Sequence, residues 1–289
     1  MSTNQIMTLI RSIRGSKGVA RGGNAKARQS KSRQLTLRLA TWNCCRGKLE
    51  NKLVPVMSLQ PDILAVQECA NPFDAFPGGT AAWVGDRSSQ GLLLLASNGY
   101  RLQSHKKTIG TSNSIKHFLA ARVRGPVEFN VLAVWAKRCE GRPAYVTTLM
   151  RGLDAFKRFI GSAPTVLLGD LNTHPVFGPA HHNFVDRLRS EFGLVSSYHA
   201  FLGETEGDES RFTHFHYRHR HRPFHIDYCF IPEDWQQKII DVMVGTHREW
   251  THLSDHVPLV VDIDVRQLLV SNGAAVKGSV AARAGRSGP

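Results

Sequence analysis

Short apolar runs recur along this 289-residue chain, and their length constrains its fold more than any other feature. Each run has four to eight residues, is rich in leucine or β-branched residues, and is bounded by Gly, Pro or Asn. The runs are Leu37–Trp42, Ile63–Gln67, Leu92–Ala96, Phe118–Val123, Phe129–Val134, Thr165–Leu168, Ile226–Ile231 and Val257–Ile263. Runs of this kind suit buried strands better than helices.

Helical periodicity is found in only three segments, which are Lys48–Leu59, Ala144–Ile160 and His181–Phe192. Many strands mixed with a few helices predict an α/β protein, with packed sheets and helices outside them. The stretch Asn71–Gly91 contains several Pro and Gly residues, so we predict an irregular surface loop there.

Positive charge is concentrated at the two ends of the chain. The formal net charge is +14, yet residues 1–34 hold eight Lys or Arg and no acid. Residues 35–270 have 26 basic and 23 acidic side chains. We therefore expect one folded domain over residues 35–268, between disordered tails at 1–34 and 269–289. The high net charge is only weak evidence for a nucleic-acid groove on the folded part.

Cysteine usage and hydropathy bear on the cellular compartment. The five cysteines are odd in number and have no CxxC spacing, which favours reduced thiols in a cytosol-like compartment. No apolar run approaches the length of a membrane span. The apolar residues of Ile6–Ile13 share one helical face beside arginines, so a mitochondrial targeting segment is an alternative to a disordered tail. We expect a cytoplasmic monomer, or mitochondrial targeting if the source is eukaryotic.

The stretch Arg211–Phe230, RFTHFHYRHRHRPFHIDYCF, holds five histidines, four arginines and one carboxylate, Asp227. It could be a metal cage, a contact for a polyanion, or an ordinary hairpin. We predict the hairpin, in which the return strand fixes the position of Asp227. Its expected arms are Phe212–Tyr217 and Phe224–Ile231, joined by a solvated turn at Arg218–Pro223. The charges of the turn could reach a polyanion or face solvent, and adventitious Zn²⁺ or Ni²⁺ binding by histidine pairs is a further alternative.

Polar side chains stand where several of the apolar runs begin or end. They are Asn43 in TWN, Glu68 in VQE, Asp170 and Asn172 in LLGDLN, and Asp255 and His256 in LSDH. One such residue could be a turn or cap residue. Four such placements, together with Asp227 on a strand, are hard to attribute to turns alone.

These groups are the ones that phosphoester hydrolysis requires. A hard cation such as Mg²⁺, held by carboxylate and amide oxygens, neutralises the phosphate and steadies the leaving oxygen. A carboxylate can take a proton from the attacking water, while a His–Asp pair and an amide can hold phosphoryl oxygens. A zinc cage is disfavoured because the cysteines lack ligand spacing.

The motifs TWN, QE, GDLN, HIDY and SDH, in this order, resemble the endonuclease/exonuclease/phosphatase superfamily with the deoxyribonuclease I-like fold. The resemblance spans residues 35–265 and is closest to the bacterial exonuclease III-like branch. It implies a four-layer α/β/β/α sandwich with the site at one end of two packed sheets. It also implies Mg²⁺ as the cofactor, with Mn²⁺ as a possible substitute.

Carried over to this sequence, the resemblance implies a metal group and a catalytic group. The metal group is Asn43, Glu68 and Asp255, with Glu68 as the main ligand. In the catalytic group, Asp170 would align or deprotonate the attacking water, and Asn172 would hold a phosphate oxygen. His256 would face the scissile phosphate and would be oriented by Asp227.

Three further residues are candidate substrate contacts. Where many relatives have Tyr or His, this chain has Trp135, whose indole could contact phosphate or simply pack in the core. Arg46 could meet phosphate or be a solvated charge. His174, two residues beyond Asn172, could line the cleft.

The sequence alone leaves three functions open. The favoured function is a Mg²⁺-dependent phosphodiester hydrolase that acts as a nuclease on DNA or RNA. The second is a phosphatase or phosphodiesterase for a small phosphorylated molecule or lipid headgroup. It ranks lower because HIDYCF lacks the tryptophan–cysteine–aspartate–arginine run of inositol phosphate phosphatases. The third is a non-catalytic binding protein on the same fold, which the full set of oxygen ligands argues against.

Overall fold

A computed structural model describes residues 36–72, 76, 79–105, 117–138 and 144–268. The two expected tails, the segment Ile6–Ile13 and Cys139 lie outside these residues. Within them, four cysteines are free thiols, namely Cys44, Cys45, Cys69 and Cys229. No helix of the described ranges is long and apolar enough to cross a membrane.

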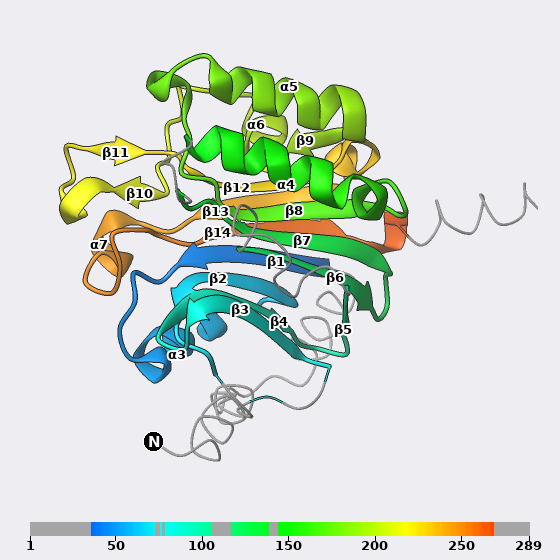
Figure 1. Ribbon diagram of the computed structural model, residues 1–289, viewed down its shortest axis with the longest axis horizontal. Coiled ribbons are helices and arrows are strands. Elements are labelled where there is room, and N and C mark those ends of the chain that lie inside the picture. Colours follow the sequence, from blue (N-terminus) through cyan, green and yellow to red (C-terminus); the bar gives the residue numbers. More distant parts are fainter. Residues whose placement is uncertain (1–35, 73–75, 77–78, 106–116, 139–143, 269–289) are drawn as a thin grey trace, which may run out of the picture.

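Two six-stranded sheets form the centre of the molecule (Figure 1). The first has the order β13-β14-β1-β2-β4-β3 and the second β5-β6-β7-β8-β12-β9. The strands of the first sheet are β1 (Thr36–Asn43), β2 (Ile63–Cys69), β3 (Ala81–Arg87), β4 (Gln90–Ala96), β13 (Ile239–Val244) and β14 (Leu259–Asp264). Those of the second are β5 (Arg101–Ser104), β6 (Phe118–Arg124), β7 (Phe129–Trp135), β8 (Thr165–Asp170), β9 (Leu194–Ser196) and β12 (Asp227–Pro232).

Three apolar clusters show how the layers are stacked. The largest joins residues of both sheets, including Leu39 of β1 and Val131 of β7, so it is the core between the sheets. A second packs the outer face of the second sheet against α4 (Tyr145–Ile160) and α5 (Ala180–Phe192). A third packs the outer face of the first sheet against α3 (Leu49–Ser58). The expected four-layer α/β/β/α sandwich is therefore confirmed.

The eight apolar runs all become strands, and the three helical patterns become α3, α4 and α5. The predicted loop at Asn71–Gly91 is wrong in part, because β3 lies within it and pairs with β4. The sequence of β3, AAWVGDR, has no buried alternation, since most of this edge strand is only half-buried. Backbone pairing with β4 stabilises β3 as a strand, although its hydrophobic pattern does not indicate one.

The predicted hairpin is present but shorter than expected. Its paired strands are β10 (His214–Phe215) and β11 (Pro223–Phe224), joined by residues 216–222. The chain then leaves the hairpin, and Asp227 begins β12 in the second sheet. The expected alternation is confirmed there, because Tyr228 and Phe230 face the helices while Cys229 and Ile231 face the core between the sheets. Two short helices, α6 (Ser197–Leu202) and α7 (His247–Trp250), complete the described elements used below.

Strand directions bring the polar strand ends to one edge of the sandwich. β1 and β2 are parallel, with Asn43 opposite Gln67, so both end at the same edge of the first sheet. β8 and β12 are antiparallel, with Asp170 directly opposite Asp227, so the end of one strand meets the start of the other. Residues distant in sequence can therefore form one site.

Candidate active site

Gly169 allows β8 to deliver Asp170 to this edge. Its φ of 149° lies in a region that favours glycine, and a Cβ there would be 1.8 Å from the carbonyl oxygen of Val134. Asn172 also has a positive φ, 50°, which Asn tolerates better than most residues. The GDLN motif thus forms a sharp turn at the end of β8, and only glycine fits at position 169.

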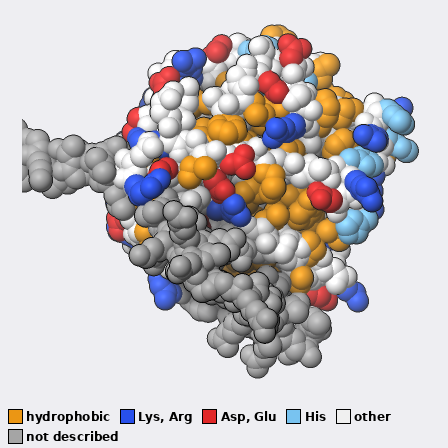
Figure 2. Space-filling view, turned by 180° about the vertical axis from the view of Figure 1, so that it is seen from behind, with side chains coloured by type: hydrophobic (Ala, Val, Ile, Leu, Met, Phe, Trp, Pro, Cys, Tyr) orange, Lys and Arg blue, Asp and Glu red, His pale blue; other side chains and the backbone are white. Residues whose placement is uncertain are grey.

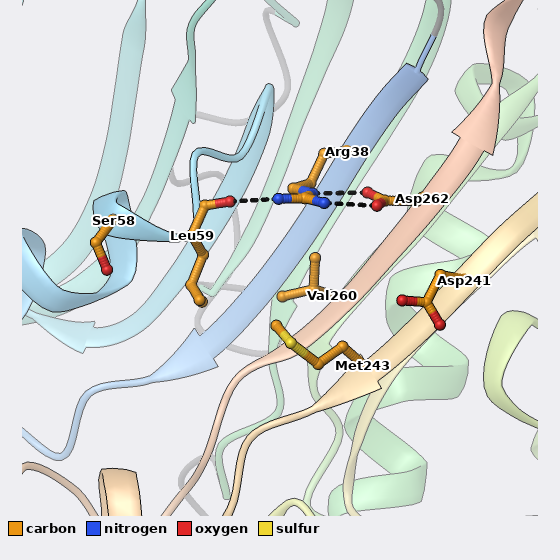
Figure 3. A pocket seen from close by; sticks show the side chains of 7 residues that line it. All are labelled: Arg38, Ser58, Leu59, Asp241, Met243, Val260 and Asp262. Atoms are coloured by element: carbon orange, nitrogen blue, oxygen red, sulfur yellow. Dashed lines mark hydrogen bonds and ion pairs between the residues drawn. The ribbon is translucent and has the colours of Figure 1, made fainter. Parts of the chain in front are cut away.

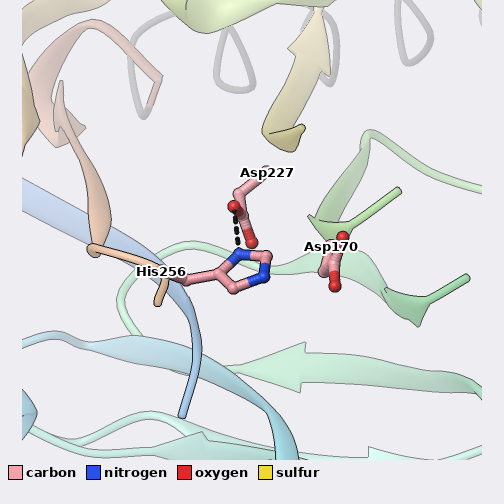
Figure 4. Close-up of side chains that lie close together, drawn as sticks. All are labelled: Asp170, Asp227 and His256. Carbon is pink, nitrogen blue, oxygen red and sulfur yellow. Dashed lines mark hydrogen bonds and ion pairs between the residues drawn. The ribbon is translucent and has the colours of Figure 1, made fainter. Parts of the chain in front are cut away.

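Asp170, Asp227 and His256 form the centre of the site. One ligand atom of each lies within 4.8 Å of the others, and all three residues are buried. Asp227 Oδ2 is 2.8 Å from Nδ1 of His256, and Figure 4 shows the imidazole between the two carboxylates. The structure therefore brings together three residues that lie 29 to 86 positions apart in the chain.

The charges of this group are strongly coupled. Burial opposes a charge on His256, but the adjacent charge and hydrogen bond of Asp227 raise its pKa to about 10. Burial raises the pKa of Asp170 to about 7, opposed by the charge of His256 and reinforced by that of Asp227. At neutral pH, His256 is therefore an imidazolium held by Asp227, and Asp170 titrates close to neutrality.

Two hydroxyl groups fix this arrangement. Thr213 Oγ1 accepts hydrogen bonds from the backbone N–H groups of Ile226 (3.1 Å) and Asp227 (3.0 Å). Ser254 Oγ donates to the carbonyl of Asn43 (2.7 Å) and accepts from the backbone N–H of His256 (3.0 Å). Sequence reasoning missed both as site residues, although Ser254 is the serine of the SDH motif.

Glu68 lies at a bulge in β2, where the pairing register with β4 shifts. Its φ of 57° and the bulge turn the side chain out of the regular alternation, as bulges often do beside active sites. Its Oε1 accepts from Asn43 Nδ2 (3.3 Å), and its Oε2 accepts from Arg46 Nε (3.3 Å) and Gln90 Nε2 (3.0 Å). Gln90 is a further residue that the sequence did not single out.

Asn43 links Glu68 to Asp170. Its Nδ2 also donates to Asp170 Oδ2 (2.9 Å), and its Oδ1 accepts the backbone N–H of Cys45 (3.0 Å). Asn172 donates to the same Asp170 oxygen (2.9 Å) and to the carbonyl of Ala136 (3.0 Å). In this geometry, both amides orient carboxylates.

Asp255 lies on the other side of His256, near Cys45 and His214. Its Oδ2 is 3.9 Å from His214 Nε2. Although burial acts to raise it, the pKa of Asp255 is lowered by the charge of His256 and a hydrogen bond from Cys45. Burial and the charge of His256 lower the pKa of His214 to about 4, so His214 is neutral beside the imidazolium of His256.

The candidate substrate contacts have different surroundings. Trp135 is only 4% exposed within the core between the sheets, with its ring centroid 4.7 Å from that of His117. Arg46 is exposed and paired with Glu68. His174 is placed outside the catalytic group, because its Nε2 is 3.1 Å from Glu209 and its Nδ1 accepts from Val176 N–H.

A separate pocket lies over β1, β13 and β14, and Figure 3 shows its lining. Its cation, Arg38, is held by both oxygens of Asp262 at 2.7 and 2.6 Å and by the carbonyl of Leu59 at 2.8 Å. These bonds give the guanidinium its partners within the protein, so Arg38 does not need a ligand in this pocket.

The model of the Endonuclease/Exonuclease/phosphatase family matches residues 40–256, which include every polar strand end described above. The chain belongs to this family. As a member of the Endonuclease/Exonuclease/phosphatase family, it is a hydrolase of phosphoesters. No curated protein matches the chain.

Solved structures confirm the family fold. A 3′-5′ exonuclease, NExo, from Neisseria meningitidis is 21% identical, with a TM-score of 0.59, covering 79% of this chain and 100% of its own. The endonuclease domain of TRAS1, a telomere-specific non-LTR retrotransposon, is 17% identical, with a TM-score of 0.58 and coverage of 80% and 99%. A truncated TDP2 from Caenorhabditis elegans is 16% identical, with a TM-score of 0.59 and coverage of 79% and 98%.

Proposed function

We propose that this protein is a Mg²⁺-dependent phosphodiester hydrolase that cleaves nucleic acid by attack of water. The observation that carries the proposal is the cluster of Asp170, Asp227 and His256 at the sheet edge, joined through Asn43 to Glu68. It combines an acceptor for a proton, a fixed cation and an oxygen ligand for a metal within one connected group.

Asp170 is the acceptor for the proton of the attacking water. A carboxylate offers about four acceptor positions. Three are used by the backbone N–H of Asn172 and the two amide groups of Asn43 and Asn172. One position remains, and a pKa of about 7 suits a base that acts near neutral pH.

His256 binds and stabilises the phosphoryl group. Its Nδ1 is held by Asp227, so the ring presents its other N–H on the side of Asp170 (Figure 4). A fixed imidazolium stabilises the charge that builds up on phosphoryl oxygens without reorganising during the reaction. Asp227 acts as the positioning residue for this cation.

The donor set around Glu68 suits Mg²⁺. Its carboxylate is only partly buried, and Asn43, Arg46 and Gln90 orient it. Carboxylate oxygens are the ligands that hard cations prefer, and a bound Mg²⁺ would neutralise phosphate charge and support the leaving oxygen. In the observed orientation, Asn43 would hold Glu68 in place for the metal, with Asp255 beyond Cys45 as a further carboxylate of the same edge.

The group of Asp170, Asp227 and His256 is less suited to holding the metal itself. One nitrogen of His256 is already bonded to Asp227, and the raised pKa makes the ring a cation near neutral pH. A histidine that binds a metal must have a neutral imidazole ring. The imidazolium already occupies the place between the two carboxylates, whereas Glu68 offers its carboxylate at the partly exposed edge.

Nucleic acid is the favoured substrate class for two reasons. A structure of NExo from Neisseria, described as a 3′ phosphatase, is bound to a product DNA hairpin. The site here also lies beside a run of exposed arginines, which is described below. The 3′ phosphatase description of NExo makes a terminal phosphate of nucleic acid a second candidate substrate.

The test uses the full-length protein with Mg²⁺, with and without EDTA. Substrates are an abasic-site duplex, a 3′-phosphorylated oligonucleotide, single-stranded DNA, RNA, bis-p-nitrophenyl phosphate and inositol phosphates. We expect cleavage of at least one nucleic acid that is lost with EDTA and in the Glu68→Ala and His256→Ala variants. Hydrolysis of inositol phosphates alone would contradict the proposal, as would cleavage that survives in both variants.

A further inference from the structure

The tip of the hairpin, residues 216–222, is an unusual charged surface. We call these residues, HYRHRHR, the tip segment. All seven are exposed, and they comprise three arginines, three histidines and Tyr217, without an acid. In Figure 1 the hairpin projects from the body beside α7, and Figure 2 shows basic and histidine side chains gathered at that edge.

The tip segment has a defined backbone. The N–H of His216 donates to the carbonyl of Arg222 (3.0 Å), and that of Arg222 donates to the carbonyl of His219 (3.1 Å). Tyr217 and Arg218 have φ angles of 53° and 62°, a left-handed conformation that costs energy in non-glycine residues. The chain therefore holds these side chains outward on a closed turn.

Several arginines elsewhere in the described residues pair with carboxylates, but those of the tip segment do not. Arg38, Arg187 and Arg266 each form ion pairs with carboxylates at 2.5 to 2.6 Å. Within the described ranges, the guanidinium groups of the tip segment have no carboxylate partner; they are those of Arg218, Arg220 and Arg222. Three such adjacent guanidinium groups are suited to an external anion, because their planar forks match phosphate.

The base of the hairpin is bonded directly to the catalytic segment. The N–H of Phe215 donates to the carbonyl of Asp255 (2.7 Å), and His214 forms a backbone bridge with His256. The rings of these two histidines lie 4.5 Å apart. On the far side of the hairpin, His247 Nε2 of α7 contacts the carbonyl of Arg218 (3.0 Å). The tip segment is thus held in a fixed position relative to His256.

The distance from tip to site suits a polymer. Arg218 lies four positions after His214, a span of at most about 14 Å at 3.3–3.6 Å per residue. Phosphates of one strand of duplex DNA recur about every 3.4 Å along the helix axis. A strand with one phosphate at His256 can therefore present further phosphates to the tip segment within a few nucleotides.

We propose that the tip segment binds the phosphate backbone of a nucleic-acid chain whose scissile phosphate lies at His256. This proposal rests on the proposed function and identifies its substrate as a polymer that extends beyond the cleavage site. Counterion release from the contacted phosphates supplies the binding energy, so the contact is independent of base sequence and weakens with salt. Nucleic acid is favoured over an acidic protein because the tip segment is continuous with a phosphoester site.

The test compares a triple variant, R218S, R220S and R222S, with the full-length wild type. The matched control removes three exposed arginines from α4 and α5, as R151S, R158S and R189S. For each protein, kcat/KM is measured with an oligonucleotide and with bis-p-nitrophenyl phosphate over a range of KCl concentrations. Binding of the labelled oligonucleotide and of polyglutamate is measured in parallel by fluorescence anisotropy.

We expect the tip variant to lose about 10- to 1,000-fold in kcat/KM for the oligonucleotide, with most of the loss in KM. The slope of log kcat/KM against log salt should become shallower by about 2 to 3, because each lost phosphate contact contributes about 0.7–0.9. Hydrolysis of bis-p-nitrophenyl phosphate should match the wild type, and the control variant should change little with either substrate.

Several results would overturn the proposal. An unchanged KM and salt slope in the tip variant would leave the arginines as solvated charges. Equal losses with both substrates would mean that the substitutions damaged the catalytic segment. Polyglutamate binding as tight as that of the oligonucleotide, and equally lost in the tip variant, would identify an acidic protein as the partner. Failure of the proposed function is seen separately, in the wild type, as an absence of oligonucleotide cleavage.

Discussion

Two buried clusters of histidine and carboxylate differ in how many of their polar atoms have hydrogen-bond partners within the protein. In the first, the catalytic cluster, Asp227 uses Oδ2 for His256, while its Oδ1 is buried without a hydrogen-bond partner among the described residues. In the second, which we call the Glu209 cluster, Glu209 accepts from Nε2 of His174 and from Nε2 of His199, each at 3.1 Å.

The Glu209 cluster is closed. The remaining ring nitrogen of His174 accepts from Val176 N–H, and that of His199 is 2.8 Å from Ser196 Oγ. Burial opposes the charge of Glu209, yet hydrogen bonds from the two histidines hold its pKa well below the usual range. Both clusters therefore contain strongly shifted pKa values, so a shift alone does not identify an active site. Polar atoms left without a protein partner separate the catalytic cluster from the structural one.

The largest expected difference is between two histidine substitutions. His256→Ala should lower kcat for phosphodiester hydrolysis by about 10²- to 10³-fold, the usual cost of removing one group that stabilises charge in the transition state. His174→Ala should stay within about threefold of the wild type in the same assay, because its ring only bonds structural groups. Similar losses in both variants would contradict the distinction between the clusters.

The next effect is a dependence on pH that only the catalytic cluster should produce. Asp170 accepts a proton only as the carboxylate, and its pKa is raised to about 7. The rate should therefore be constant between about pH 7 and 10, fall about tenfold per pH unit below about 7, and fall again above about 10, where His256 loses its charge. A pH–rate profile of kcat checks this slope, and Glu209→Gln should retain the same profile. A rate that stays flat down to pH 5 would exclude Asp170 as the base.

A smaller difference in kcat is expected between substitutions of two serines, one in each cluster. Ser254→Ala removes the hydroxyl that joins Asn43 to His256, so kcat should fall about 10- to 100-fold through misplacement of the ring. Ser196→Ala removes the hydroxyl beside His199 and should change kcat by less than about twofold. Single-turnover rates measure both variants. A kcat of Ser254→Thr close to that of the wild type would support positioning of the ring through the hydroxyl.

The smallest effect on activity, but a clear effect on stability, should come from Glu209→Gln. The substitution leaves buried groups of His174 and His199 imperfectly paired, at a cost of about 1–3 kcal/mol in the free energy of unfolding. Tm should fall by about 2–4 °C for each kcal/mol in a domain of this size. Calorimetry measures the shift. Full stability together with lost activity would reverse the assignment of the two clusters.

Much of the fold could be predicted because its central strands are continuous apolar runs. The strands that escaped prediction lie at or near sheet edges, where burial is incomplete and the pattern is weak. β3 is half-buried, and β13 is largely exposed or half-buried. Such strands gain their order from a neighbour through backbone pairing, a contribution that is independent of side-chain hydrophobicity.

The candidate site was predictable where chemistry requires a particular residue type. Asp170, Asp227 and His256 were predicted together and are brought into one cluster. Thr213 and Gln90 were missed because hydroxyl and amide side chains occur throughout any sequence, and only tertiary contacts give them a role. His174 could not be separated from the catalytic residues by sequence, since its partner Glu209 lies 35 positions away.

In the proposed function, Glu68 and the cluster of Asp170, Asp227 and His256 together perform metal-dependent phosphodiester hydrolysis. The most direct measurement is a Mg²⁺ titration of oligonucleotide cleavage by the wild type, Glu68→Gln and Glu209→Gln. Glu68→Gln should abolish cleavage or raise the required Mg²⁺ concentration at least about tenfold. Glu209→Gln should follow the wild-type curve. A Glu68→Gln curve that coincides with the wild type would contradict the claim.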